Sequence, residues 1–106
     1  EAETVRKEMP FSILLPADSF YPDCEKGEKI FLQGIMDCLL ETKDGLTVID
    51  YKTDRVMTEV ELREHYKIQL QVYGEAAEKL LGKPVVHLFL WAFRLGKAID
   101  IPLHRN

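Results

Sequence analysis

The sequence predicts a single α+β (α/β) domain with a mixed β-sheet, in the order three strands, one helix and two strands. β-branched and apolar residues dominate several short segments, which is typical of strands. Asp44-Gly45 separates two of these segments and is typical of a hairpin turn. One long segment of helical periodicity follows the third strand and leads back to the sheet as a crossover helix. The 106 residues suffice for one domain with one core, spanning 1–106.

The first half of the chain is predicted to form two strands separated by a loop. Residues 5–15 form the first strand, and Pro10 marks an edge or a bulge because proline cannot donate to a ladder. Residues 16–27 are rich in turn formers and predict a loop, which ends in a turn at 25–28. Residues 29–40 are apolar almost throughout, which predicts a central strand covered on both faces.

Two residues in these strands have a more specific interpretation. Gly34 within the second strand indicates a bulge or the close approach of another backbone. Glu8 is either a third acidic ligand on the sheet or an exposed residue, and exposure is the favoured interpretation.

The second half begins with a third strand at 46–52, and then a helix start is clear. Thr58 with Glu61 three residues later forms a capping box. Gly82 and Pro84 end the helix, and strands follow at 85–93 and through Ile99 and Ile101. The predicted helix stripe consists of Leu62, Tyr66, Gln69, Leu70, Tyr73, Ala77 and Leu80.

The composition limits the possible functions. Hydrophobic residues make up 46% and charged residues 30%, as in ordinary globular domains. No apolar run approaches the ~20 residues of a membrane span, and the polar start shows no secretory signal. We therefore expect no membrane association and a cytoplasmic location. Cys24 and Cys38 are spaced neither as metal ligands nor as a disulfide framework.

The net charge of −4 bears on nucleic-acid binding. Domains that hold DNA by bulk electrostatics are usually basic. Any nucleic-acid contact is therefore expected to be local, metal-assisted or supplied by another domain. The chain lacks an initiating Met and has strand-like sequence from Val5, so we expect a fragment of a longer protein.

Three charged residues interrupt the apolar strands. Asp50 and Lys52 are two residues apart and so project from the same face, and a neighbouring strand can bring Asp37 alongside them. Two close carboxylates repel unless a positive charge lies between them, and hard oxygen ligands favour Mg²⁺ or Mn²⁺. Lysine beside the metal can stabilise negative charge or orient a water, as phosphodiester hydrolysis requires. The other interpretation is an exposed hairpin edge with a surface ion pair.

A second constellation lies on the predicted helix. Tyr66, Gln69 and Tyr73 stand at i, i+3 and i+7 and share one face. Their polar ends need partners when buried. These partners are the carboxylates with their waters, or a phosphate or base of bound DNA. Alternatively, both tyrosines are half-buried residues with hydrated hydroxyls.

Together these motifs resemble the RecB-like branch of the PD-(D/E)XK nuclease superfamily. The resemblance rests on Gly34-x-x-Asp37, on Asp50-Tyr51-Lys52-Thr53 and on Tyr66-x-x-Gln69-Leu70-x-x-Tyr73, in that order. The Glu8-x-Pro10-Phe11 segment is also similar. The likeness covers about residues 5–101.

The resemblance implies a restriction-endonuclease-like core with a β-hairpin and a crossover helix. It implies a metal held by Asp37, Asp50 and the backbone carbonyl of Tyr51, with Lys52 as the catalytic lysine. The accessory, DNA-contacting residues would be Gln69 and Tyr73, with Tyr66 on the same face.

Two departures from the family pattern are evident. Met36 replaces the proline before the first Asp, as is common in this branch. The family also places a metal-ligating histidine on a helix before the first strand, and the sequence shows no such helix. His65, His87 and His104 lie on the wrong elements to replace it, so we expect them to be structural or exposed.

The leading hypothesis is a magnesium-dependent deoxyribonuclease. It would be the exonuclease domain of an ATP-dependent helicase–nuclease in double-strand-break repair and recombination. Helicase domains would deliver single-stranded DNA, and a partner subunit would complete a heterodimer. The isolated chain is expected to fold but to cleave slowly or not at all. The alternative is a non-catalytic module with a decayed nuclease fold that holds DNA or a partner protein, and a stand-alone exonuclease is a weaker third hypothesis.

Overall fold

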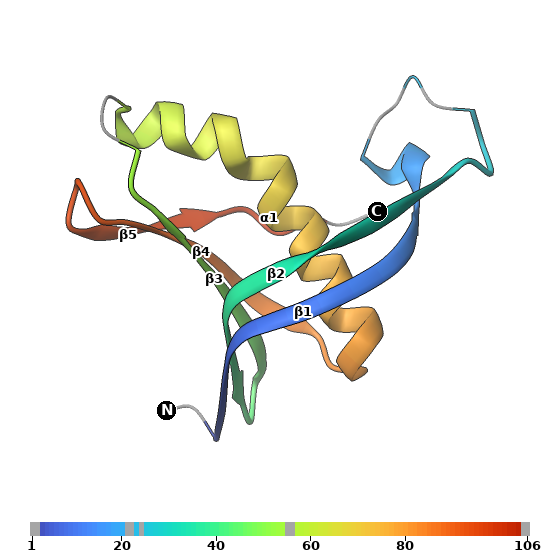
Figure 1. Ribbon diagram of the computed structural model, residues 1–106, viewed down its shortest axis with the longest axis horizontal. Coiled ribbons are helices and arrows are strands. Elements are labelled where there is room, and N and C mark those ends of the chain that lie inside the picture. The colour runs from blue at the N-terminus through green and yellow to red at the C-terminus, as the bar shows by residue number, and fades with distance from the viewer. Residues whose placement is uncertain (1–2, 21–22, 24, 55–56, 105–106) are drawn as a thin grey trace.

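The structure is a computed structural model that describes residues 3–20, 23, 25–54 and 57–104. Its five strands and one long helix follow the predicted order (Figure 1). A single 3-10 turn, Ala17–Ser19, follows the first strand. The bounds are β1 Thr4–Pro16, β2 Lys29–Thr42, β3 Gly45–Lys52, α1 Glu59–Leu81, β4 Val85–Ala92 and β5 Lys97–Ile101.

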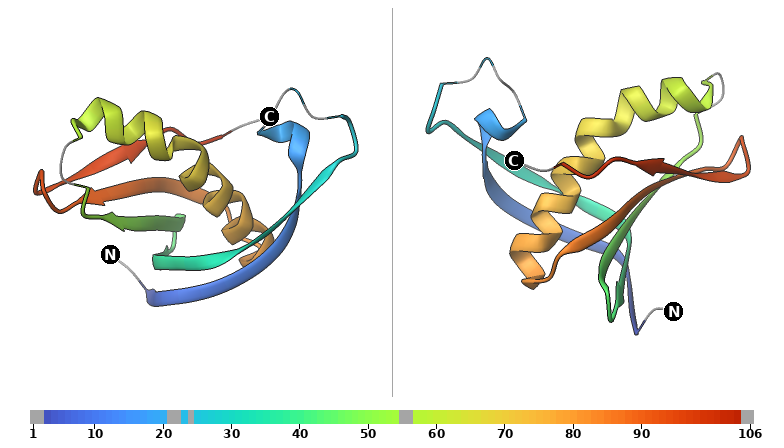
Figure 2. Two further views of the ribbon diagram at one scale, coloured as in Figure 1. Left: turned by 45° about the horizontal axis from the view of Figure 1, so that its top comes forward. Right: turned by 180° about the vertical axis from the view of Figure 1, so that it is seen from behind.

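The strands form one mixed sheet in the order β1-β2-β3-β4-β5. All neighbours are antiparallel except β3 and β4, which are parallel because α1 connects them as a crossover. The helix lies across one face of this sheet, as the two views of Figure 2 show. This arrangement confirms the predicted α+β class, the hairpin at Asp44-Gly45 and the place of the fourth strand beside the hairpin.

The core lies between α1 and the sheet. Buried leucines come from both layers, including Leu39 on β2, Leu70 on α1 and Leu88 on β4. Gly74 allows the close approach of helix and sheet, since a Cβ there would lie 3.0 Å from a methyl carbon of Leu88. The sequence analysis did not assign this role to Gly74.

The helix begins and ends as predicted. The Thr58 backbone amide donates to Glu61 Oε1 at 2.8 Å, and the Glu61 amide donates to Thr58 Oγ1 at 3.2 Å, so the capping box is complete. Gly82 ends the helix in the left-handed conformation with φ 67°. Leu80 was wrongly assigned to the buried stripe: it is exposed, because the last turn extends beyond the sheet.

Strand β2 is not covered on both faces, so that prediction was wrong. Phe31 and Ile35 are 60% and 55% exposed. The ladder between β2 and β3 covers only the end of β2 from Cys38 to Thr42, and the earlier part pairs with β1 alone. The one helix covers a single face of this two-stranded ribbon.

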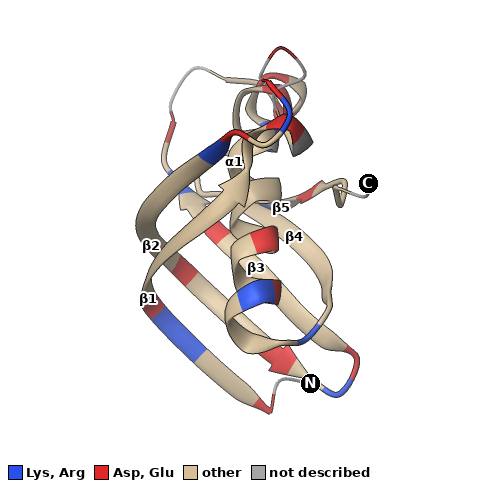
Figure 3. Cartoon of the chain, turned by 90° about the vertical axis from the view of Figure 1, so that its right-hand side faces the viewer, with Lys and Arg blue, Asp and Glu red and all other residues tan. Residues whose placement is uncertain are grey.

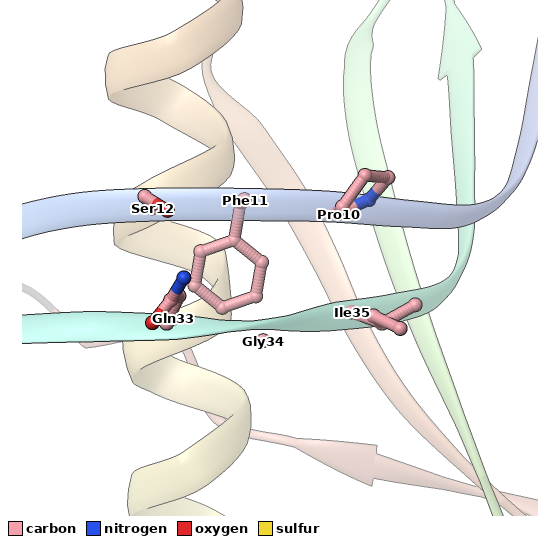
Figure 4. A pocket seen from close by; sticks show the side chains of 6 residues that line it. All are labelled: Pro10, Phe11, Ser12, Gln33, Gly34 and Ile35. Atoms are coloured by element: carbon pink, nitrogen blue, oxygen red, sulfur yellow. The ribbon is translucent and has the colours of Figure 1, made fainter.

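The close approach predicted at Gly34 involves a side chain and not a backbone. Gly34 is paired with Phe11 of β1, and a Cβ at Gly34 would lie 3.2 Å from the Phe11 ring. Figure 4 shows this ring lying across Gly34, in a pocket also lined by Pro10 and Gln33. The glycine thus makes room for a buried aromatic side chain.

The ribbon of β1 and β2 bends beside the predicted acidic position. Glu8 has φ 51°, a left-handed conformation that is unusual for a side-chain-bearing residue, and it lies at the register position opposite Asp37. The pairs on either side keep their register, so no residue is inserted. Pro10 lies on the sheet's edge strand, as predicted.

Candidate active site

The two acidic residues singled out in the sequence lie side by side. The last pair of the β2–β3 ladder is Cys38 with Ile49, so Asp37 and Asp50 occupy the next opposed positions. Opposed residues of antiparallel strands project from the same face. The two carboxyl groups are in fact within hydrogen-bonding reach of each other. The predicted convergence of these acids is therefore confirmed.

Asp37 also terminates the ladder. Its Oδ2 accepts a hydrogen bond from the backbone N–H of Tyr51 at 2.8 Å. The Tyr51 ring lies on the opposite face, where it packs edge-to-face against Phe93 with ring centroids 5.8 Å apart. It is thus the backbone of Tyr51, and not its ring, that lies at the acidic pair.

Lys52 shares this site because it lies two residues beyond Asp50 on the same strand. Its Nζ is 3.0 Å from Asp50 Oδ2, and its side chain is 19% exposed. The ammonium also lies 4.2 Å from the centroid of the Tyr66 ring, in cation–π geometry. This half-buried ion pair excludes the exposed hairpin edge as a description of these residues.

The electrostatics of the site disfavour a charged Asp50. Burial, followed by the neighbouring Asp37 carboxyl, raises the pKa of Asp50 from its ordinary 3.8 to about 6, although Lys52 acts in the opposite direction. Asp50 is 4% exposed. Its Oδ2 has the ion pair with Lys52 but no hydrogen bond of good geometry from the described residues.

The helix stripe faces the same site. Gln69 Nε2 donates to the Tyr73 hydroxyl at 3.4 Å, and the Tyr73 ring packs edge-to-face on Phe11. Burial raises the pKa of Tyr73, and the charges of Asp50 and Asp37 raise it further, which places its hydroxyl near the acids. Gln69 Oε1 is buried and has no hydrogen-bond partner among the described residues.

One residue of this cluster was missed in the sequence. Asp54 Oδ2 accepts a hydrogen bond from the Tyr66 hydroxyl at 2.8 Å. Asp54 continues the alternation of Asp50 and Lys52 by two more residues. An extended chain keeps such residues on one face, so this spacing was the available signal.

The other candidates lie away from the acidic pair or outside its cluster. His65 and His87 are exposed, and His104 stacks on Phe20 at 4.6 Å, which agrees with the expectation for all three. Glu8 is exposed, as favoured. Among residues 3–20, 23, 25–54 and 57–104, no three His, Cys, Asp or Glu side chains are grouped as a metal cage.

The acidic pair nevertheless fits a divalent cation. It offers hard carboxylate oxygens from Asp37 and Asp50, which suit Mg²⁺ or Mn²⁺. Asp50 Oδ2 is buried without a hydrogen bond from the described residues, and a cation there would offset the repulsion that raises the pKa of Asp50. Magnesium sites commonly use one or two carboxylates and complete their shell with water and substrate phosphate.

This sheet, with its crossover helix and paired acids followed by a lysine, defines the class. The family model of the PD-(D/E)XK nuclease superfamily matches residues 1–104, and the chain belongs to that superfamily. Its α+β architecture fits the restriction-endonuclease-like fold. Nucleases of this superfamily generally use divalent metals.

Individual relatives are more specific. The chain is 40% identical over 104 residues to an ATP-dependent helicase/nuclease subunit of Clostridium botulinum (strain Okra / Type B1). It is 37% identical over 111 residues to the protein of the same name from Bacillus mycoides (strain KBAB4). Each match covers 94% of this chain but only 8% or 9% of the relative, so the chain spans less than a tenth of their length.

Proposed function

We propose that this chain is the nuclease domain of a longer helicase–nuclease and that it hydrolyses DNA phosphodiester bonds with Mg²⁺ or Mn²⁺. The observation that carries the proposal is the convergence of Asp37, Asp50 and Lys52 at one end of the β2–β3 hairpin. A surface ion pair does not require a second, buried carboxylate beside it.

Each residue has a distinct role in this proposal. Asp37, Asp50 and the backbone carbonyl of Tyr51 hold the cation, which when bound polarises the phosphate and lowers the pKa of a water. Lys52 orients that water or stabilises the negative charge that develops on the phosphate. Because its ammonium is largely removed from water, its charge acts more strongly than it would on the surface.

The helix supports the site. Gln69 holds the Tyr73 hydroxyl by a hydrogen bond, and both face the acids. The carbonyl oxygen of Gln69 lacks a partner among the described residues, so it can accept a hydrogen bond from a water or a nucleotide base. We propose that Gln69 and Tyr73 contact the DNA strand.

The relatives' name supports the wider setting. By analogy with these helicase/nuclease proteins, helicase domains of the same protein deliver single-stranded DNA in an ATP-dependent manner. We infer a role in double-strand-break repair and recombination, a cytoplasmic location and a second subunit. The charge distribution agrees with delivery by other domains, since Figure 3 shows basic residues dispersed among acidic ones along the chain. None of the described helices is both long and apolar enough to cross a membrane.

The test is made in the full-length protein with Asp50→Ala and Lys52→Ala. Each variant is expected to lose DNA cleavage by at least about 100-fold, the size typical of a lost charge-stabilising group, while unwinding continues. Lys83→Ala is the matched control, because Lys83 pairs with Glu41 at the other end of the hairpin. Cleavage at the wild-type rate in both site variants would end the assignment.

A further inference from the structure

The ammonium of Lys52 is held by two different groups. Asp50 Oδ2 lies at 3.0 Å on one side, and the face of the Tyr66 ring lies at 4.2 Å to its centroid. Lysine has a flexible four-carbon stem that loses rotamer freedom when it is fixed. Two such contacts therefore restrict a side chain that would otherwise sample many positions.

These two contacts differ once Asp50 binds a cation. A carboxylate that holds a divalent cation is a weaker partner for an ammonium, because the two positive charges repel each other. An aromatic face attracts the ammonium without using the carboxylate. The Tyr66 ring can thus keep Lys52 in place when Asp50 is engaged elsewhere.

The Tyr66 ring is itself fixed. Its hydroxyl donates to Asp54 Oδ2 at 2.8 Å, and the His65 ring packs edge-to-face against it at 4.6 Å. Tyr66 belongs to α1, whereas Asp54 lies just after β3, so this hydrogen bond ties the helix to the strand that carries Lys52. A phenol that donates to a carboxylate gains electron density on its ring, which strengthens its attraction for a cation.

We propose that Tyr66, anchored by Asp54, is a positioning residue that holds the Lys52 ammonium at the reaction centre. The inference rests on the proposed function, because it takes Lys52 as the group that acts on the phosphate or water. It assigns Tyr66 a role apart from DNA binding: the lysine contacts the face of its ring, and its hydroxyl donates to Asp54. Gln69 and Tyr73 remain the DNA-contacting residues of the stripe.

The experiment measures cleavage of single-stranded DNA with Mg²⁺ by the full-length protein, with kcat and KM determined separately. Tyr66→Met keeps an apolar side chain of similar length but removes the ring face, and it is expected to lower kcat about tenfold with little change in KM. Tyr66→Phe keeps the ring and is expected to lose at most about threefold, as is Asp54→Asn, which weakens the anchor. His65→Leu is the control, because it removes a neighbouring ring that does not contact Lys52.

A double variant tests whether Tyr66 acts through Lys52. Adding Tyr66→Met to Lys52→Ala is expected to cause no further loss of kcat, since the positioned group is already gone. Wild-type kcat in Tyr66→Met, or a raised KM with unchanged kcat, overturns the inference, and the second result makes Tyr66 a DNA contact. If Tyr66→Met does not fold, equal kcat in Asp54→Asn, Tyr66→Phe and wild type overturns it. Lys52→Ala at the wild-type rate would instead contradict the proposed function.

Discussion

At the scale of single residues, the site depends on a carboxyl group that its surroundings keep from ionising easily. Asp50 is buried beside Asp37, and this raises its pKa to about 6, while the ion pair with Lys52 offsets part of the effect. In the metal-free protein the charged form of Asp50 is therefore a cost to the folded state. Binding groups are often destabilising in this way, because their partner is absent.

The sign of the pH dependence follows directly. The folded-state pKa of Asp50, about 6, lies above its ordinary 3.8, so the folded protein binds more protons between these values. Its contribution to the free energy of unfolding then decreases as the pH rises from about 4 to about 6, and stays low above that range.

We therefore predict that Asp50→Asn stabilises the metal-free protein at neutral pH. The amide removes the buried charge, and the gain should shrink towards pH 4, where Asp50 is protonated in wild type. Urea unfolding in the presence of a chelator, at several pH values, measures this difference. An Asn variant that is less stable than wild type at pH 7 would contradict the prediction.

At the scale of elements, the β2–β3 hairpin sets the register that opposes Asp37 and Asp50. The hairpin turn depends on Gly45, whose φ of 141° is unfavourable for other residues. A Cβ at Gly45 would also lie 2.4 Å from the carbonyl oxygen of Pro84, which accepts a hydrogen bond from Leu46. The start of β3 is thus packed against the segment that leads into β4.

Gly45→Ala is predicted to destabilise the protein by about 3 kcal/mol, since backbone strain and a steric clash combine. Gly96→Ala is the matched control: Gly96 also has a positive φ, 66°, but a Cβ there meets nothing within 4 Å. This control is expected to cost about 1 kcal/mol from strain alone. Chemical denaturation compares the two variants, and equal losses would show that the Pro84 contact has no effect.

At the scale of the whole molecule, the site joins parts that are distant in sequence. Asp37 comes from β2, Asp50 and Lys52 from β3, and Tyr66 and Tyr73 from the crossover helix. The helix can reach the acids only because it packs across the same face of the sheet (Figure 1). A cation at the acids would therefore bind the folded state and stabilise it.

This coupling predicts a metal stoichiometry. Nucleotide-free full-length protein is expected to bind one more Mn²⁺ ion than its Asp37→Ala variant, as measured by electron paramagnetic resonance of free Mn²⁺. Asp44→Ala is the control, because this exposed acid lies at the hairpin turn. Equal binding by wild type and Asp37→Ala would favour a non-catalytic module that holds DNA or a partner protein.

The sequence by itself determined the order of the elements, the hairpin, the limits of the helix and the residues that form the site. These features are local: period-two and period-3.6 patterns, a turn dipeptide, a capping box and the Asp-x-Lys spacing can all be read within a few residues. The alternation of Asp50 with Lys52 also placed both on one face before any fold was known.

Only the tertiary structure decided how exposed β2 is, how Phe11 fills the space at Gly34, and which partners Tyr66 has. These depend on which surfaces meet, and residues 12 or more positions apart supply the contacts. An apolar run has the same composition whether one face or both are covered, so Phe31 and Ile35 were misassigned. Likewise, the carboxylate of Asp54 and the ring of Tyr66 come together only because the helix returns over the strand that precedes it.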